Sequence, residues 1–285
     1  MIVVRLRSGL GNQMFQYAFF LQLRKWYGDE NVKLDIDTYH WKAHNGRELD
    51  KVFRINLNEV SVPESISLQM ADVGYSLQNR LLRRLRGKKH QCYKFWKDLS
   101  FEDYKHLPKD IYLEGYWPEE RYFIEIEKTV RKEFCFPELT DQPNKDILYE
   151  INNTCSIGVH VRRGDYQSHK NTFSMCPAKY YREASSIIKE KKINLHFFIF
   201  SDDIKWCKSN LNFEDTTTFV CVNSEKDSYK DMMLMSNCKH QIIANSTFSW
   251  WAAWLNANPD KMVIYPSFMD MRYNFMPLSW IKIIV

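Results

Sequence analysis

The sequence lacks the patterns that mark membrane proteins and zinc proteins. No uncharged apolar run in the 285 residues approaches the roughly 18 residues that a membrane-spanning helix needs. The seven cysteines include no C-x-x-C pair and the eight histidines form no H-E-x-x-H motif, so no zinc site is indicated. Low-complexity tracts and internal repeats are also missing, which leaves a globular chain.

Two further absences bear on the compartment in which the protein works. Residues 1–7 do not resemble a signal peptide, because arginines interrupt their short apolar run and no small-residue cleavage site follows. The number of cysteines is odd, and Cys155, Cys207 and Cys221 lie in or beside expected helices and strands, where a reduced buried thiol is usual. We therefore expect a protein of the reducing cytoplasm.

The net charge of +5 is unevenly distributed. Residues 80–89 hold six basic residues interleaved with leucines. Such a segment is typical of a solvated helix face, and also of a peripheral contact with an anionic membrane, here the inner membrane, or with a lipid-pyrophosphate acceptor. Nucleic acid is a less suitable partner, because aromatic residues do not cluster around the segment.

The C-terminal half alternates between strand-length apolar segments and helical patterns. Strands are expected at 156–161, 195–200, 217–222, 240–244 and 262–265, and helices near 177–191, 203–210, 227–237 and 247–256. This alternation predicts βαβ units and a mostly parallel, doubly wound sheet.

The N-terminal half is less regular. Two strands are expected at 2–6 and 32–36, with a helix at 12–27 after a glycine turn, whereas 40–60 and 75–118 show no regular pattern. Residues 136–146 carry two prolines and few apolar side chains, which predicts the link between two domains. The expected domains are 1–140 and 141–285.

Polar residues follow three of the predicted C-terminal strands. Arg162 and Arg163 follow the first, Asp202 and Asp203 the second, and 245–249 the fourth. Ligands of open α/β sheets bind beyond the carboxyl ends of the strands, so these three segments are expected to converge on one ligand site.

Each of these segments has two interpretations. Arginine presents a planar fork of donors that matches phosphate oxygens, but Arg163 and Asp165 could also form a structural ion pair. Asp202 or Asp203 could accept hydrogen bonds from a guanine, and one of them is expected to cap the following helix. The start of 245–249 is typical of a phosphate cradle, and the two tryptophans after it are expected in the core.

The N-terminal half offers two weaker motifs. In one interpretation, Gly9 and Gly11 serve only to permit close packing of the turn. In the other, the helix that follows directs its N-terminus and the Asn12 amide towards a phosphate or a sugar. Asp35 and Asp37 have the D-x-D spacing of metal-dependent glycosyltransferases. They lie away from the convergent edge, and alternation places Asp35 on a solvent face, so no metal site is predicted.

Taken together, the chain resembles the glycosyltransferase family 11 α-1,2-fucosyltransferases, the bacterial members in particular. The H-x-R-R-x-D core is also shared with α-1,6- and protein O-fucosyltransferases. The block N-S-T-F-S-W-W-A-A-W-L narrows the resemblance to family 11. The matching segments are 9–17, 160–166, 198–203 and 231–254.

The resemblance implies a GT-B fold, an α/β architecture in which two Rossmann-like domains face a central cleft. The first domain would present the acceptor and the second would hold GDP-fucose. The implied reaction is an inverting, metal-independent transfer of L-fucose from GDP-β-L-fucose to the 2-hydroxyl of a terminal β-galactoside. GDP-fucose is the donor substrate and no cofactor is implied. O-antigen or another surface glycan is the expected product.

The resemblance also assigns residue roles. Arg162, with Arg163 beside it, would hold the β-phosphate, and Asn12 would reach the donor from the other domain. Independently of the resemblance, inversion by direct displacement needs a base for the acceptor hydroxyl. Asp165 is the candidate because it lies nearest the donor motif, unless it only orients Arg163. His160 and Asp202 would contact the guanosine, and the diphosphate would be lined by Ser246, Thr247 and Phe248.

Two alternatives remain at this point. One is a fucosyltransferase of another linkage, such as α-1,6 onto a chitin-type oligosaccharide. The other is a non-catalytic module that binds a sugar nucleotide or a glycan.

Overall fold

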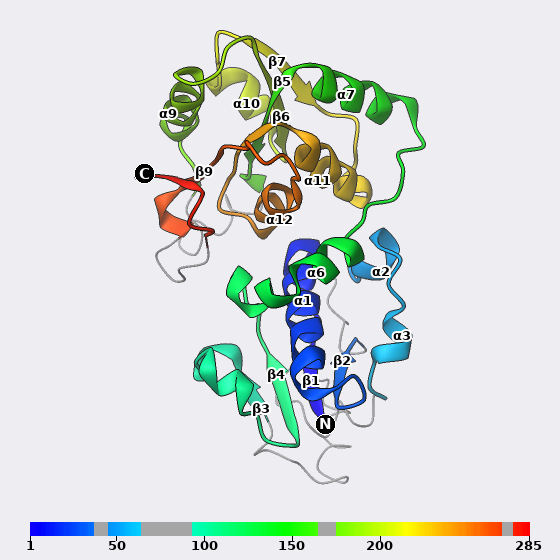
Figure 1. Cartoon of the computed structure of the whole chain (residues 1–285). Helices are drawn as coiled ribbons and strands as arrows, with labels where there is room; N and C mark the ends of the chain where they lie inside the picture. The colour runs from blue at the N-terminus through cyan, green and yellow to red at the C-terminus, as the bar shows by residue number, and fades with distance from the viewer. Residues whose placement is uncertain (37–44, 64–92, 165–174, 270–275) are drawn as a thin grey trace. The chain divides into compact units, whose positions relative to one another are not determined.

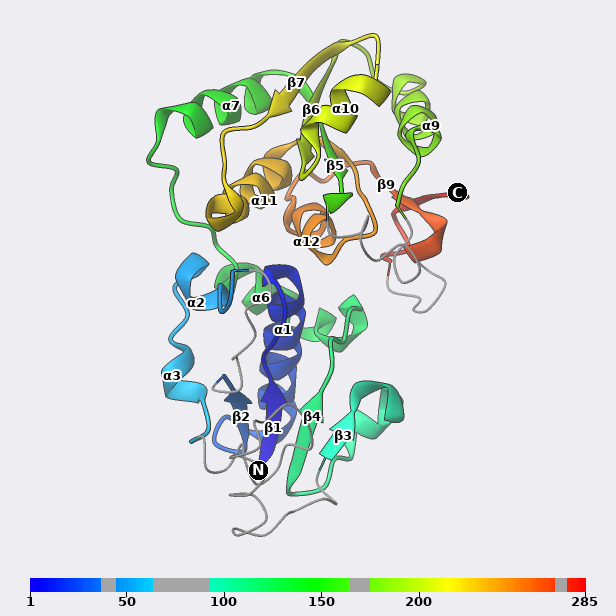
Figure 2. The same cartoon turned by 180° about the vertical axis from the view of Figure 1, so that it is seen from behind.

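The computed structural model describes residues 1–36, 45–63, 93–164, 175–269 and 276–285 (Figures 1 and 2). The chain divides into two compact units, which we call unit 1, Met1–Phe136, and unit 2, Pro137–Val285. The sequence places this boundary after residue 140. No helix among the described residues is long and apolar enough to span a membrane.

Unit 1 is built on a parallel four-stranded sheet in the order β2-β1-β4-β3. Its strands are β1 (Ile2–Arg5), β2 (Val32–Asp35), β3 (Tyr93–Phe95) and β4 (Ile111–Glu114). Its α-helices are α1 (Leu10–Tyr27), α2 (Leu49–Val52), α3 (Leu57–Val60) and α6 (Glu127–Glu133). Its short 3-10 helices are η2 (Trp96–Asp98), η3 (Glu102–Lys105), η4 (Glu120–Tyr122) and η5 (Ile124–Ile126).

Helix α1 supplies much of the core of unit 1. Its buried face includes Phe15 and Phe19, and the Phe19 ring stacks on Trp117 with ring centroids 4.5 Å apart. The Trp117 indole donates a hydrogen bond of 2.8 Å to the Tyr104 hydroxyl, which satisfies a polar group inside this aromatic cluster. The helix starts two residues earlier than the sequence predicts, directly after Gly9.

Unit 2 is built on a parallel six-stranded sheet in the order β10-β9-β8-β5-β6-β7. Its strands are β5 (Cys155–Val161), β6 (Leu195–Ser201), β7 (Thr216–Val220), β8 (His240–Ile242), β9 (Val263–Pro266) and β10 (Ile281–Ile283). Its helices are α7 (Gln142–Asn153), α9 (Ala178–Lys189), α10 (Ile204–Asn210), α11 (Ser228–Asn237), α12 (Thr247–Leu255), η6 (Glu225–Asp227) and η7 (Ser267–Met269). The predicted doubly wound sheet is confirmed.

Alternation along β5 shows how the helices of unit 2 cover both faces of its sheet (Figures 1 and 2). Ile157 and Val159 pack in one cluster with α9 and α10. Gly158 faces α11 on the other side, where a Cβ atom would lie 3.2 Å from the sulfur of Cys238. The glycine therefore permits the close packing of α11 on the sheet.

The boundary between the units falls inside the segment 136–146, where the sequence predicts the link. The second half of this segment is helical, because α7 starts in it at Gln142. The Asp141 carboxylate accepts a hydrogen bond from the Asn144 main-chain N–H at 3.1 Å, and Pro143 occupies the first turn. Proline is tolerated there because the first helical N–H groups have no partner within the helix.

Candidate functional site

The three strands of unit 2 that end in polar segments are adjacent in the sheet. β5 lies between β8 and β6, and the register pairs Val161 with Ser201 and Val159 with Ile242. The chain that leaves each strand therefore starts at the same edge, as predicted. We call this edge, with the described residues that follow β5, β6 and β8, the donor edge, because the sequence predicts that the donor binds there.

The two arginines of the donor edge are held by the two aspartates. Arg162 Nη1 lies 3.0 Å from Asp202 Oδ2, and Asp202 Oδ1 accepts a hydrogen bond of 2.8 Å from the Arg163 main-chain N–H. Arg163 Nε donates to Asp203 at 3.4 Å, and its guanidinium lies 4.0 Å from the centre of the Trp206 ring. Both arginine side chains stay partly exposed, at 29% and 16%.

These contacts decide between some of the earlier interpretations. Asp203 caps α10 by accepting from the Trp206 main-chain N–H at 3.0 Å, so one of the two aspartates is a helix cap, as expected. The carboxylate that pairs with Arg163 is that of Asp203, after the end of β6, whereas Asp165 lies outside the described residues. The sequence analysis did not identify Trp206. Its position one turn after Asp203 could have indicated it, because guanidinium groups often lie over aromatic rings.

His160 is a buried imidazole beside these arginines. It lies on β5, 6% exposed, with its ring 5.5 Å from the Phe248 ring. Burial, with the positive charge of Arg162, lowers the pKa of His160 to about 3, so the ring is neutral near pH 7. Its Nδ1 has no hydrogen-bond partner among the described residues. A buried polar atom without a partner is uncommon, and a bound ligand is one group that could satisfy it.

The N-terminus of α12 completes the donor edge. Ser246 caps the helix, because its Oγ accepts from the Phe248 main-chain N–H at 3.3 Å. The first turn, which includes Thr247, carries no acidic residue, so its partial positive charge favours an anion. Trp250 and Trp251 are fully buried, which confirms that they belong to the core.

A further polar cluster of unit 2 escaped the sequence analysis. Asn223, after β7, donates to Asp231 of α11 at 2.7 Å and exchanges amide hydrogen bonds of 2.8 and 2.9 Å with Asn144. Burial raises the pKa of Asp231 to about 6, although the Asn223 hydrogen bond lowers it. Asn144 stands 79 positions before Asn223, so no local pattern predicts their contact.

In unit 1, Asn12 lies in the first turn of α1, the helix that follows β1. Its side-chain amide donates to Ser8 Oγ at 3.0 Å, and Ser8 has a φ of 72°. That backbone conformation is uncommon outside glycine, and it lets the chain turn from β1 into the helix.

The expected exposure of Asp35 is wrong. Asp35 is fully buried at the end of β2, where it accepts a hydrogen bond from the Tyr112 hydroxyl. The reason is its position in the sheet, because parallel pairing places it next to Arg5 of β1. Asp37 lies outside the described residues. Among those described, no group of three or more His, Cys, Asp or Glu side chains is arranged to hold a metal.

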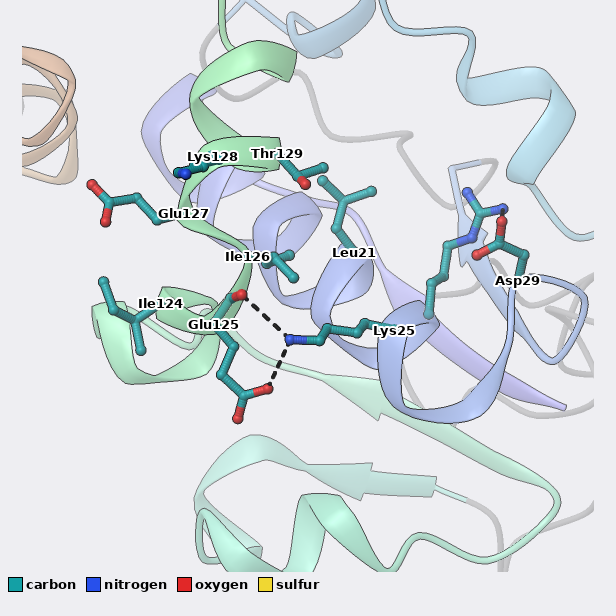
Figure 3. A pocket seen from close by; sticks show the side chains of 10 residues that line it. Leu21, Lys25, Asp29, Ile124, Glu125, Ile126, Glu127, Lys128 and Thr129 are labelled. Atoms are coloured by element: carbon teal, nitrogen blue, oxygen red, sulfur yellow. Dashed lines mark hydrogen bonds and ion pairs between the residues drawn. The ribbon is translucent and has the colours of Figure 1, made fainter.

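A surface pocket of about 710 Å³ also lies in unit 1, between the last turns of α1 and the segment 124–129 (Figure 3). Lys25 crosses it to Glu125, with Nζ 3.2 Å from the carboxylate. None of the predicted site residues lines this pocket, so it lends no support to the predicted donor site. The basic segment 80–89 lies outside the described residues, as does any contact that it makes with a membrane.

Comparison with known proteins gives a consistent result. The family model "Glycosyl transferase family 11" matches residues 1–276. An α-1,2-colitosyltransferase of Escherichia coli is 32% identical over 99% of this chain and 98% of its own. The O-antigen biosynthesis glycosyltransferase WbnK of Escherichia coli is 30% identical over 92% of each chain. Galactoside α-(1,2)-fucosyltransferase 1 of Pan troglodytes is 27% identical over 86% of this chain and 62% of its own.

Among solved structures, that of an Arabidopsis thaliana FUT1 mutant in complex with GDP aligns with a TM-score of 0.52. The alignment covers 93% of this chain and 70% of that chain, at 11% identity. At this identity the likeness concerns the fold alone. With the two parallel sheets, it confirms the predicted GT-B class.

Proposed function

The chain belongs to glycosyltransferase family 11, and from this premise we propose that it is a galactoside 2-α-L-fucosyltransferase. It transfers L-fucose from GDP-β-L-fucose to the 2-hydroxyl of a terminal β-galactoside, with inversion and without a metal. The observation that carries the proposal is the donor edge, where Arg162 and Arg163 are fixed by carboxylates beside the buried imidazole of His160.

The chemistry of the transfer explains why fixed arginines are needed. As the fucosyl–oxygen bond breaks, negative charge accumulates on the departing GDP. Donors that are already oriented stabilise this charge more in the transition state than in the ground state. Asp202 orients Arg162 through its side chain and Arg163 through its main chain. We therefore assign Asp202 a positioning role in addition to any contact with the guanosine.

The remaining donor contacts follow from the same edge. The N-terminus of α12, with Ser246, Thr247 and Phe248, is suited to the diphosphate because its N–H groups and helix dipole favour an anion. The Nδ1 of His160, which has no hydrogen-bond partner in the described part of the chain, is suited to a polar atom of the nucleotide. Asp165, which follows Arg163 closely in the chain, is the proposed general base for the acceptor hydroxyl.

Two relatives bear on the donor sugar and the product. The name of the α-1,2-colitosyltransferase favours colitose as a second candidate donor sugar with the same α-1,2 linkage, and we propose that this sugar too would be carried on GDP. WbnK carries O-antigen biosynthesis in its name, which supports an O-antigen glycan as the product. Both donors require the same GDP site, so the donor edge does not depend on which sugar is transferred.

The proposal is tested by incubating the purified protein with GDP-fucose and a panel of β-galactosides. We expect products heavier by one fucosyl residue, and methylation analysis should place the fucose on the galactose 2-hydroxyl. Attachment at a 6-hydroxyl would favour the α-1,6 alternative. Transfer from GDP-colitose but not from GDP-fucose would favour the second donor. Binding of GDP-fucose without transfer or hydrolysis would favour a non-catalytic module.

A further inference from the structure

The carboxyl edge of the unit 1 sheet carries a row of buried charges. The neighbouring strands β2, β1 and β4 end at Asp35, Arg5 and Glu114, and none of the three residues is more than 3% exposed. Arg5 Nη1 donates to Glu114 Oε2 at 2.9 Å, and the other oxygen of Glu114 accepts from Nη1 of Arg7. The row therefore alternates in sign and extends to Arg7, beyond the end of β1.

Core packing does not account for this row. Removing charges from water costs several kcal/mol for each ion, and apolar side chains of similar volume are often at least as stabilising as a buried ion pair. The same strands use Val4, Leu34 and Leu113 for packing, all fully buried. The charges stand where the strands end, which is where ligands of doubly wound sheets bind. Their position therefore indicates a ligand.

Two buried glutamines of α1 hold this edge rigid. Gln16 accepts a hydrogen bond of 2.8 Å from the Arg7 main-chain N–H and donates one of 2.8 Å to the Gly115 carbonyl, so it ties the loop after β1 to the loop after β4. Gln13 ties the loop after β1 to the loop after β2, with bonds of 2.6 and 3.0 Å. The main chain that carries Arg7 is thereby fixed on two sides.

Arg7 is the arginine of the row that reaches solvent, with 27% of its side chain exposed against 2% for Arg5. We propose that Arg7 is an acceptor-binding residue, whose guanidinium donates hydrogen bonds to hydroxyl oxygens of the terminal acceptor sugar. This inference rests on the proposed function and on the expectation, from the family resemblance, that the first domain presents the acceptor. Glu114 orients the guanidinium and Gln16 fixes its main chain, so little conformational entropy is lost when the sugar binds.

The charges of the row favour a neutral acceptor. Arg5 and Arg7 face Glu114 and Asp35, so the row has no net charge. An anionic sugar such as a uronic acid would compete with Glu114 for Arg7, and a displaced buried carboxylate is costly. Neutral hydroxyls can accept hydrogen bonds from the partly exposed Arg7 side chain while its ion pair stays intact.

The test compares Arg7→Gln and Arg7→Lys with a matched control, Arg24→Gln. Arg24 has a similar exposure, 23%, and pairs with Asp29 at 2.8 Å at the far end of α1. Calorimetry measures the affinity for methyl β-lactoside in the presence of GDP and, separately, the affinity for GDP. We expect both Arg7 variants to lose about tenfold or more in lactoside affinity, a factor that corresponds to about 1.4 kcal/mol. GDP affinity should not change, and the control should match the wild type in both.

Deoxy acceptors distinguish a contact from a general structural role. Removing the hydroxyl that Arg7 binds should weaken binding to the wild type but not weaken it further in Arg7→Gln, because the two losses are one interaction. The 3-deoxy and 4-deoxy galactosides are the probes. If Arg7→Gln fails to fold, Arg7→Lys keeps a cation beside Glu114 and carries the same test.

Binding is measured without turnover, so the two proposals can fail separately. If the wild type binds lactosides but transfers no sugar, and Arg7→Gln loses that binding, the proposed function is wrong and the assignment of Arg7 holds. The assignment is overturned if Arg7→Gln binds lactosides as the wild type does. Equal deoxy penalties in both proteins, or no binding of any neutral galactoside by the wild type, would also overturn it.

Discussion

At the scale of single residues, the donor edge is defined by carboxylates that each serve two partners. Asp202 accepts from the Arg162 side chain and the Arg163 main chain, and Asp203 accepts from Arg163 while it caps α10. A Cβ atom at Gly164 would lie 2.9 Å from Asp202 Oδ2, so the glycine leaves room for this carboxylate. The arginines are therefore oriented before any ligand binds.

This orientation leads to a prediction for Arg162. Arg162→Lys should reduce activity nearly as much as Arg162→Ala. An ammonium cannot bind Asp202 and a phosphate at the same time in the geometry that a planar guanidinium provides. We expect a loss on the order of 10²-fold or more in kcat/KM, the scale observed when one transition-state donor is removed. Arg182→Lys, on an exposed position of α9, is the control. Near-normal kcat/KM in Arg162→Lys would exclude Arg162 as the diphosphate anchor.

The buried imidazole of His160 gives a prediction for pH. Its pKa is lowered from 6.5 to about 3 in the folded protein, so between these values the unfolded state binds a proton that the folded state does not. The stability that this neutral imidazole contributes is therefore lost as the pH falls from 6.5 towards 3. Over that range the wild type should lose stability more steeply than His160→Gln, by about 1.4 kcal/mol for each pH unit.

Urea denaturation of both proteins at pH 6.5, 5.5 and 4.5 measures this difference. Contributions from the other titrating groups largely cancel when the two proteins are compared at the same pH. Parallel pH profiles for the wild type and His160→Gln would show that His160 titrates normally and is not enclosed as described.

At the scale of elements, the N-terminus of α12 is predicted to combine a helix cap with a phosphate site. Ser246→Asp should retain the cap, since aspartate is a strong N-cap residue, and should keep stability close to wild type. The added negative charge should weaken GDP binding by about tenfold or more, because it faces the diphosphate. Ser246→Asn caps without charge and is the matched control. Equal GDP affinities in the two variants would exclude this helix from the donor site.

Elements that are long and uninterrupted were predictable from the sequence. β5 and β6 are seven-residue apolar strands, and α12 begins at a serine followed by a run of apolar residues. β3 and β4 lie within 75–118, where the sequence shows no regular pattern. α7 was obscured by a proline in its first turn.

Site residues divide in a similar way. Polar groups that directly follow a long strand could be placed on one edge, because parallel strands end together. The row formed by Asp35, Arg5 and Glu114 could not, since Glu114 stands 109 positions after Arg5 and only the strand order brings them together. The same holds for Asn144 and Asn223, which are 79 positions apart.

At the scale of the whole molecule, the account predicts how the reaction depends on metals. Because the proposal assigns Arg162 and Arg163 to the negative charge that develops on GDP, transfer should proceed in excess EDTA at near the full rate. The measurement is the initial rate of fucose transfer with and without EDTA, at saturating donor and acceptor. Complete loss of activity that manganese or magnesium restores would contradict this prediction and direct attention to Asp35 and Asp37.

The proposed binding of the donor by unit 2 alone gives a second prediction for the whole molecule. Because the donor is assigned to unit 2, Asn12→Ala in unit 1 should lower kcat while leaving the affinity for GDP nearly intact. Calorimetric titration with GDP and steady-state kinetics separate the two effects. A parallel loss of GDP affinity would mean that Asn12 binds the nucleotide itself, and that the donor site includes residues of both units.

The central claim is that the donor nucleotide binds at the carboxyl edge of the unit 2 sheet. Hydrogen–deuterium exchange of the full chain, with and without saturating GDP, tests it most directly, because each loop of that edge reports separately. We predict that GDP slows exchange most strongly in 160–164, 201–203 and 245–249, with little change in 45–60. Protection centred on 45–60, with unchanged exchange at 160–164, would contradict the account and would mean that unit 1 holds the donor.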